Sequence, residues 1–275
     1  MTSGFLMLVG LFLGLALGKM IYQNRYRKKY RQEHMNSLNC HFLPSNRTEF
    51  YAVTIATDIS PQSKRLLKSL HRNNIEASIL AVGCKWQGFG NKIFWLREYF
   101  ATLDLLTDLD PIILFVDAYD VINLAPRAEL LEKFRSFDCP IVVGAEKNCW
   151  PNPAEAPLFP NQEKPYRFLN AGCVMGYKSA ISSCIAGFSI SPMDSEQGAW
   201  TKAFLCGENK IKIDYDGKLF FNLHGADLSD YEATGTEGGR WRLTHSRETP
   251  CIIHGNGPSG KVLNSIYPMD ARKLG

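Results

Sequence analysis

The run of apolar residues from Pro111 to Val116 constrains the fold of this 275-residue chain more than any other feature. A strand that is apolar at successive positions buries both of its faces, as strands do in a sheet covered by helices on both sides. Strand-like and helix-like patterns alternate around this run. Strand patterns lie at 50–57, 77–83, 111–116 and 141–145, and helical patterns lie at 62–73, 91–106 and 126–137. The alternation predicts an α/β fold with a mostly parallel central sheet.

Hydrophobic residues also dominate the N-terminus. The first 18 residues carry no charged side chain, and residues 5–17 are almost all apolar or glycine. A helix of that length spans about 27 Å, close to the roughly 30 Å core of a bilayer. Two interpretations stay open, a single-pass signal-anchor helix and a cleavable signal peptide. We therefore expect a hydrophobic helix at 1–22, a basic, polar stem at 23–45 and one globular domain at 46–275.

The net charge of +4 comes from the stem rather than from the globular domain. All six positive side chains of the first 35 residues lie between Lys19 and Arg31, and the rest of the chain is nearly neutral. That distribution excludes a basic nucleic-acid-binding domain and suits a stem that binds anionic lipid. A basic flank favours a cytosolic domain. The glycosylation sequon at 46–48 and the eight cysteines favour an oxidising lumen instead, so both orientations stay open.

Two carboxylates, Asp117 and Asp120, follow the apolar run directly. In an open α/β sheet, ligands bind beyond the carboxyl ends of the strands. Carboxylate oxygens suit Mg²⁺ or Mn²⁺, and such an ion can bridge the two phosphates of a nucleotide. The spacing therefore predicts a metal and nucleotide site at this edge of the sheet. The structural alternative is a turn in which the two aspartates only cap the following segment.

A second group of polar residues lies near the C-terminus, where a short apolar strand runs into a glycine-rich turn. His254 can complete the metal site, although a lone histidine in a turn is more often only hydrogen-bonded. Gly255 lets backbone amides approach a phosphate, and Lys261 can neutralise its charge. The stretch from Gly255 to Lys261 fits the skeleton of a P-loop, but Val262 stands where Ser or Thr is required. Too few residues follow to build a P-loop domain, so we exclude the nucleoside triphosphatase class.

Four separate motifs occur in order along the globular domain: Phe115–Val121, Ala145–Pro151, Arg167–Gly172 and His254–Pro258. In residues and order they resemble the glycosyltransferase domain of the procollagen lysyl hydroxylase family. The resemblance covers nearly the whole globular domain, from Tyr51 to Pro268. It implies a GT-A fold, a UDP-sugar donor and Mn²⁺ as the cofactor.

The resemblance also assigns roles to individual residues. It implies that Asp117, Asp120 and His254 hold the metal. It implies a donor site that contains the following residues: Thr57, Trp86, Lys92, Tyr119, Asn170, Gly255 and Lys261. Within that site, Tyr119 resembles the aromatic residue that stacks on uracil, and Trp86 resembles a second donor-site aromatic residue. Ordinary core packing stays the alternative for both rings.

The acceptor side departs from the family pattern. The family has an acidic run before a glutamine, whereas this chain reads Asp194-Ser195-Glu196-Gln197, so a serine replaces one carboxylate. Asp194 and Glu196 are therefore the two candidate catalytic acids. Asn170 is expected to face the acceptor together with this region.

Together these features predict a membrane-tethered, Mn²⁺-dependent hexosyltransferase, with Mg²⁺ as the alternative ion. The predicted donor is UDP-glucose or UDP-galactose. The predicted acceptor is a hydroxyl of a protein or glycan, including hydroxylysine in a collagen-like chain. Two other classes stay open: a non-catalytic, membrane-anchored relative that binds a UDP-sugar or a collagen-like partner, and a metal-dependent phosphohydrolase that uses the same aspartates. The family resemblance favours the lumen of the endoplasmic reticulum or Golgi, and a cytosolic orientation stays open.

Overall fold

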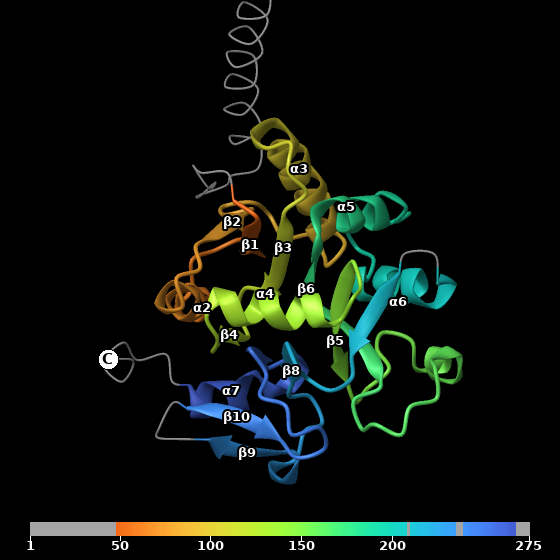
Figure 1. Ribbon diagram of the computed structural model, residues 1–275. Coiled ribbons are helices and arrows are strands. Elements are labelled where there is room, and N and C mark those ends of the chain that lie inside the picture. The colour runs from red at the N-terminus through yellow and green to blue at the C-terminus, as the bar shows by residue number, and fades with distance from the viewer. Residues whose placement is uncertain (1–47, 208–209, 235–238, 268–275) are drawn as a thin grey trace, which may run out of the picture.

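The computed structural model describes residues 48–207, 210–234 and 239–267, which form an α/β fold around a six-stranded sheet (Figure 1). The hydrophobic helix expected at 1–22 and the stem expected at 23–45 lie outside the described residues. Within the described ranges, no helix is both long and apolar enough to cross a membrane.

The large sheet has the strand order β2-β1-β3-β6-β5-β7. Its strands are β1 Phe50–Ile55, β2 Ala77–Leu80, β3 Ile112–Asp117, β5 Ile141–Glu146, β6 Phe168–Tyr177 and β7 Ile211–Asp214. β1 pairs in parallel with β2 and β3, and β5 pairs in parallel with β7. β6 is antiparallel to both β3 and β5, so it is the one strand of this sheet that runs against the others, and the prediction of a mostly parallel sheet is confirmed.

The connection between β5 and β6 explains the antiparallel direction of β6. It contains one short 3₁₀ segment, η1 Pro153–Leu158, and no α-helix. Parallel neighbours need a crossover connection, usually a helix that packs on the sheet, whereas antiparallel neighbours can be joined by a loop. The stretch between 147 and 167 therefore returns the chain antiparallel to β5.

Successive residues of β3 face two different layers of helices. The helices are α2 Pro61–Arg72, α3 Asn91–Leu106, α4 Arg127–Ser136, α5 Lys178–Ala186, α6 Glu196–Cys206 and α7 Gly260–Ile266. Ile113 and Phe115 pack in one buried cluster with residues of α3, α5 and α6. Leu114 and Val116 pack in another with residues of α2 and α4. The prediction that this apolar run is buried on both faces is thus confirmed.

A second, three-stranded sheet has the order β4-β11-β8. It is formed by β4 Val121–Asn123, β8 Phe220–Asn222 and β11 Ile252–His254. In its register, His254 lies opposite both Val121 and Asn222. Because Asp120 immediately precedes Val121, this pairing brings the distant His254 beside the aspartates at the end of β3.

The remaining elements lie near this small sheet. They are the hairpin of β9 Tyr231–Thr234 and β10 Arg240–Leu243, and the 3₁₀ segments η2 Leu228–Asp230 and η3 Gly257–Ser259. In Figure 1 the hairpin, α7 and β8 occupy the lower part of the view, below the large sheet.

Candidate metal and nucleotide site

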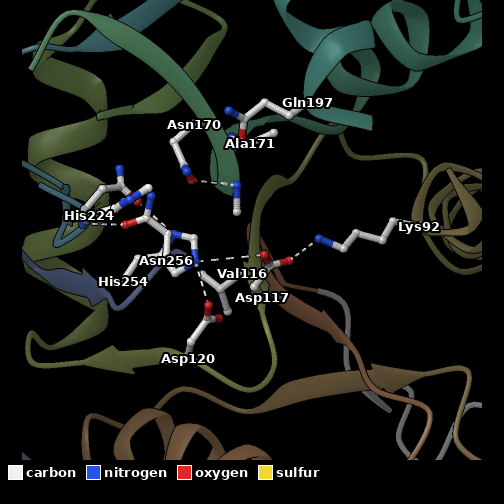
Figure 2. Close-up of polar contacts among 12 residues, drawn as sticks. Lys92, Val116, Asp117, Asp120, Asn170, Ala171, Gln197, His224, His254 and Asn256 are labelled. Atoms are coloured by element: carbon white, nitrogen blue, oxygen red, sulfur yellow. Dashed lines mark hydrogen bonds and ion pairs between the residues drawn. The ribbon is translucent and has the colours of Figure 1, made fainter. Parts of the chain in front are cut away.

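The ends of β3 and β11 bring three potential metal ligands together. Asp117 ends β3, Asp120 precedes β4, and His254 ends β11. One ligand atom from each residue lies within 4.8 Å of those of the other two. Nε2 of His254 is 3.3 Å from Oδ2 of Asp120 and 3.9 Å from Oδ2 of Asp117 (Figure 2). Two carboxylates and one imidazole suit a divalent ion such as Mn²⁺ or Mg²⁺.

Hydrogen bonds behind His254 determine which of its nitrogens faces the aspartates. Asn222 donates from Nδ2 to the carbonyl oxygen of Ala145 at 2.8 Å, which leaves its Oδ1 as an acceptor. Nδ1 of His254 lies 2.7 Å from that Oδ1 and therefore carries the proton. Nε2 therefore faces Asp117 and Asp120, and it can offer its lone pair to a metal once it has lost its proton.

We expect replacement of Asn222 by alanine to weaken metal binding about tenfold to a hundredfold, because Nδ1 of His254 loses the acceptor that fixes the ring. The measurement is the Mn²⁺ concentration that gives half-maximal protection against thermal unfolding. Asn73→Ala is a matched control, since Asn73 bonds to the backbone of α2 and lies outside this network. Equal Mn²⁺ dependence in the two variants would contradict the role given to Asn222.

Gly172 on β6 leaves space for this cluster. A Cβ atom at this position would lie 2.2 Å from Cε1 of His254 and 2.9 Å from Oδ2 of Asp117. Real Cβ atoms do not approach other atoms so closely, so a larger residue would displace both ligands. Glycine is therefore required here for the close approach of β6 to the metal ligands.

The charges of the ligands stabilise one another. Burial alone lowers the pKa of His254, but the charge and hydrogen bond of Asp120 and the charge of Asp117 raise it overall. Burial alone raises the pKa of Asp120, but the charge and hydrogen bond of His254 and the charge of Lys92 lower it overall. The cluster thus favours a protonated His254, which must lose its proton to the solvent when a metal binds.

Lys92 on α3 connects the metal ligands to α6. Its Nζ donates to Oδ1 of Asp117 at 2.6 Å and to Oε1 of Glu196 at 2.7 Å. Burial alone lowers the pKa of Lys92, but the charges of and hydrogen bonds to these carboxylates raise it overall. Burial raises the pKa of Glu196, and the charge of Lys92 opposes that rise. Oε2 of Glu196 is buried and has no hydrogen-bond partner among the described residues.

Two of the expected nucleotide residues contact each other beside the ends of β1 and β3. The hydroxyl of Tyr119 accepts from the backbone N–H of Thr57 at 3.1 Å and donates to Oδ1 of Asp58 at 2.6 Å. The side chain is 37% exposed. Tyr119 is therefore a surface ring that its hydroxyl holds in place, rather than part of the core.

Trp86 also lies at the surface, 41% exposed, and not in the core. Its ring centroid is 5.7 Å from that of Phe89, which in turn lies 6.2 Å from that of Trp150. All three side chains are exposed. Phe89 is also close to Lys92, whose Nζ is 5.4 Å from the ring centroid. The aromatic surface therefore adjoins the Lys92 side of the metal site.

The two candidate acids of the acceptor side lie in different environments. Glu196 is buried and bonds to Lys92, whereas Asp194 is exposed. The carboxylate of Asp194 accepts from the backbone N–H of Ser191 at 2.6 Å, and this hydrogen bond lowers its pKa. Ser195 caps α6 by accepting from the backbone N–H of Gly198 at 3.2 Å. Only Glu196 of the two acids contacts the residues around the metal site.

Gly255 and Lys261 also occupy different environments. The backbone N–H of Gly255 donates to the carbonyl oxygen of Asp120 at 2.7 Å, so this buried glycine holds the turn against the metal ligands. A Cβ atom on Gly255 would lie 2.9 Å from Cβ of Leu263 on α7. Lys261 lies on the exposed side of α7. Gly255 is thus a structural support of the site, whereas Lys261 is a surface cation on α7.

The sequence interpretation missed Glu146, a buried carboxylate at the end of β5. Its Oε1 accepts from Asn170 at 3.0 Å and from Gln197 at 2.8 Å, and its Oε2 accepts from Asn256 at 3.0 Å. Burial raises the pKa of Glu146, while these amide hydrogen bonds oppose the rise. The buried Asn170 therefore supports Glu146 and, through its Oδ1, the backbone N–H of Gly172.

A signal for Glu146 was present in the sequence. The residue follows the apolar strand at 141–145 directly, as Asp117 follows the strand at 111–116. Because β3 and β5 run in the same direction, both carboxylates reach the same edge of the sheet.

A family model described as "PLOD GT domain" matches residues 46–269 of this chain. The chain is 33% identical over 238 residues to a multifunctional procollagen lysine hydroxylase and glycosyltransferase of Caenorhabditis elegans, covering 79% of this chain and 32% of the relative. It is 34% identical over 226 residues to a procollagen-lysine,2-oxoglutarate 5-dioxygenase of Drosophila melanogaster. This match covers 77% of this chain and 31% of the relative. The chain thus spans about a third of the length of these relatives.

Among solved structures, one similar chain is a glycosyltransferase involved in the glycosylation of the major capsid of PBCV-1. The match has a TM-score of 0.46 at 8% identity and covers 79% of this chain and 100% of that chain.

Proposed function

The chain belongs to the PLOD GT domain family, and on that premise we propose that it transfers a hexose from UDP-glucose or UDP-galactose to an acceptor hydroxyl. The observation that carries the proposal is the cluster of Asp117, Asp120 and His254, with the exposed ring of Tyr119 next to Asp120 in the chain. A sugar nucleotide needs both features, a metal for its diphosphate and a flat apolar surface for its base.

The three ligands would hold a divalent ion, which neutralises the charge that develops on the departing diphosphate. Mn²⁺ is the better match than Mg²⁺, because the donor set includes an imidazole nitrogen. Tyr119 offers its ring to the uracil, and its hydrogen bond from the backbone N–H of Thr57 keeps the ring in place.

In this proposal, Lys92 and Glu196 interact with the acceptor side of the reaction. Lys92 holds Glu196 next to the metal site through its two short hydrogen bonds. Oε2 of Glu196 accepts a hydrogen bond from the acceptor hydroxyl, and its raised pKa is suited to proton exchange with that group. The names of the relatives motivate hydroxylysine of a collagen-like chain as the acceptor to test.

The proposal is tested by measuring UDP release from UDP-glucose and UDP-galactose with Mn²⁺, with and without a hydroxylysine-containing peptide. Stimulation of UDP release by the peptide, together with a mass increase of one hexose, supports hexosyl transfer. Release of UMP and hexose 1-phosphate instead of UDP would indicate a phosphohydrolase. Saturable binding of UDP-sugar without turnover would indicate a non-catalytic relative, the class that the serine at position 195 left open.

We expect Tyr119→Ala to raise the KM for UDP-sugar about tenfold with a smaller change in kcat, because stacking on the base contributes about equally to ground-state and transition-state binding. Tyr119→Phe keeps the ring but loses the bonds to Thr57 and Asp58, so we expect an intermediate KM. Initial rates at varied UDP-sugar concentrations give the KM of both variants. A KM for Tyr119→Ala equal to that of the parent chain would remove Tyr119 from the nucleotide site.

A further inference from the structure

The turn that follows β1 lies beside the turn that follows β3, because the two strands are neighbours in the large sheet (Figure 1). In their parallel register, Ile55 pairs with Asp117. Thr57 and Asp58 therefore leave the sheet next to Tyr119. Oδ1 of Asp58 accepts a hydrogen bond from the hydroxyl of Tyr119 at 2.6 Å. A carboxylate thus stands at the hydroxyl end of the ring to which the uracil is assigned.

The backbone polar groups of this turn are already used within the protein. The backbone N–H groups of Thr57 and Asp58 both donate to the hydroxyl oxygen of Tyr119, at 3.1 and 3.4 Å. The carbonyl oxygen of Thr57 accepts from the backbone N–H of Gly83 at 2.8 Å. Oδ2 of the exposed Asp58, in contrast, has no hydrogen bond or ion pair with the part of the chain that the structure describes. The carboxylate therefore keeps a free acceptor where the backbone does not.

The same turn connects the two aromatic residues that are expected at the nucleotide. Gly83, which bonds to Thr57, stands three residues before Trp86 in the chain. Tyr119 bonds to the turn from the other strand end. Asp58 follows Thr57 directly, so its side chain belongs to the segment that joins the residues of the proposed base site.

Uracil and cytosine have the same ring shape and differ in hydrogen bonding at one edge. N3 of uracil carries a proton and donates, whereas N3 of cytosine carries a lone pair and accepts. An ionised carboxylate can only accept. A carboxylate that is held at this edge therefore favours uracil, because it would place two acceptors opposite each other when cytosine is bound.

We propose that Asp58 determines the base specificity of the nucleotide site, with its Oδ2 accepting a hydrogen bond from N3–H of a uracil stacked on Tyr119. The inference rests on the proposed transfer from a UDP-sugar and names the residue that selects its base. The bond from the hydroxyl of Tyr119 fixes the carboxylate relative to the stacking ring. The face and the edge of the base are thus recognised by two residues that hold each other in place.

Asp58→Asn is the sharpest test, because it replaces an acceptor by a donor with little change in shape. The amide oxygen keeps the hydrogen bond from Tyr119, and the NH₂ group takes the place of Oδ2, where it donates to N3 of cytosine. The measurement is the Kd of UDP and of CDP by calorimetry with Mn²⁺, without turnover. We expect the parent chain to prefer UDP at least about a hundredfold, and this preference to fall at least about tenfold in Asp58→Asn.

Two further variants separate base recognition from support of the ring. Asp216→Asn makes the same chemical change in a half-exposed ion pair with Lys164 and should keep the preference of the parent chain. Asp58→Ala removes the carboxylate without supplying a donor, so it should bind UDP more weakly and gain nothing with CDP. Melting temperatures equal to that of Asp216→Asn exclude unfolding as the cause.

UDP methylated at N3 tests the donor on the ligand itself. The parent chain should bind it at least about a hundredfold more weakly than UDP, because the methyl group removes the proton that Asp58 accepts. Asp58→Ala should bind the two ligands about equally, since it neither accepts that proton nor fills the space. Equal binding of UDP and its N3-methyl derivative by the parent chain would contradict the role of Asp58.

An unchanged preference for UDP over CDP in Asp58→Asn would overturn the inference and leave hexosyl transfer intact. Equal weakening of both nucleotides would also overturn it, because Asp58 would then only hold the ring of Tyr119. Tighter binding of GDP than of UDP would show that the site selects another base. If the parent chain transfers no hexose but its preference changes as expected in Asp58→Asn, the proposed function fails and the base recognition stands. Binding of neither UDP nor CDP with Mn²⁺ would reject both.

Discussion

Asp120→Asn is expected to lower Mn²⁺-dependent turnover of UDP-sugar at least about a hundredfold, a loss of about 2.7 kcal/mol of transition-state stabilisation. The amide cannot supply the charged oxygen that now lies 3.3 Å from Nε2 of His254. The metal site would keep only one carboxylate and one imidazole, too few to hold a divalent ion firmly against solvent. The measurement is the rate of UDP release at saturating donor over a range of Mn²⁺ concentrations.

Asp216→Asn is the control for this result. Asp216 bonds to Lys164 at 2.5 Å in a half-exposed ion pair that is not part of the metal site. Its replacement should leave both the rate and the Mn²⁺ dependence unchanged, because exposed ion pairs contribute little. A chelator should abolish turnover in the control and in the parent chain. Turnover by Asp120→Asn at the rate of the control, or turnover that resists the chelator, would contradict the metal site.

Gly172→Ala is expected to reduce the apparent affinity for Mn²⁺ at least about tenfold and to destabilise the fold by about 1–3 kcal/mol. Both effects have the same origin. The new Cβ atom would lie 2.2 Å from Cε1 of His254 and 2.9 Å from Oδ2 of Asp117, so the strand or the two ligands must move. Thermal unfolding at increasing Mn²⁺ concentrations measures the stability and the metal affinity in one experiment.

Gly176→Ala separates strain in the strand from damage to the metal site. Gly176 lies on the same strand, and a Cβ atom there would lie 2.6 Å from the carbonyl oxygen of Pro140, away from the metal ligands. This variant should lose stability but keep the Mn²⁺ dependence of the parent chain. If Gly172→Ala binds Mn²⁺ as tightly as Gly176→Ala does, the close approach of β6 to the metal ligands has no functional importance.

Much of the fold was predictable because its signals are local. The helix at Asn91–Leu106 has the predicted bounds, and the apolar strand ending at Asp117 is buried on both faces as expected. The long strand β6 was not assigned, and its antiparallel direction follows from a connection that lacks an α-helix. The direction of a strand depends on whether the preceding connection crosses over the sheet. The segment before β6 has no regular helical or strand pattern, so its sequence does not predict the direction of β6.

Individual site residues were harder to predict than the position of the site. Asp117 and Asp120 were predicted because they directly follow an apolar strand. The same rule, applied to the end of β5, would also have predicted Glu146. Asn222 offered no local signal, because its role depends on the pairing of β8 with β11. Asp194 and Glu196 are two residues apart in the chain, yet the start of α6 between them leaves one exposed and turns the other toward Lys92.

The sequence by itself determined the class of fold, the edge of the sheet where the candidate metal ligands meet and the family of the chain, because apolar periodicity and short motifs are properties of contiguous residues. The tertiary structure decided which polar groups meet. The pairing of β11 with β4 sets His254 beside Asp120, Gly172 makes room for the ring, and the start of α6 directs Glu196 to Lys92. These relations depend on contacts between residues far apart in the chain, which only the packing of strands and helices creates.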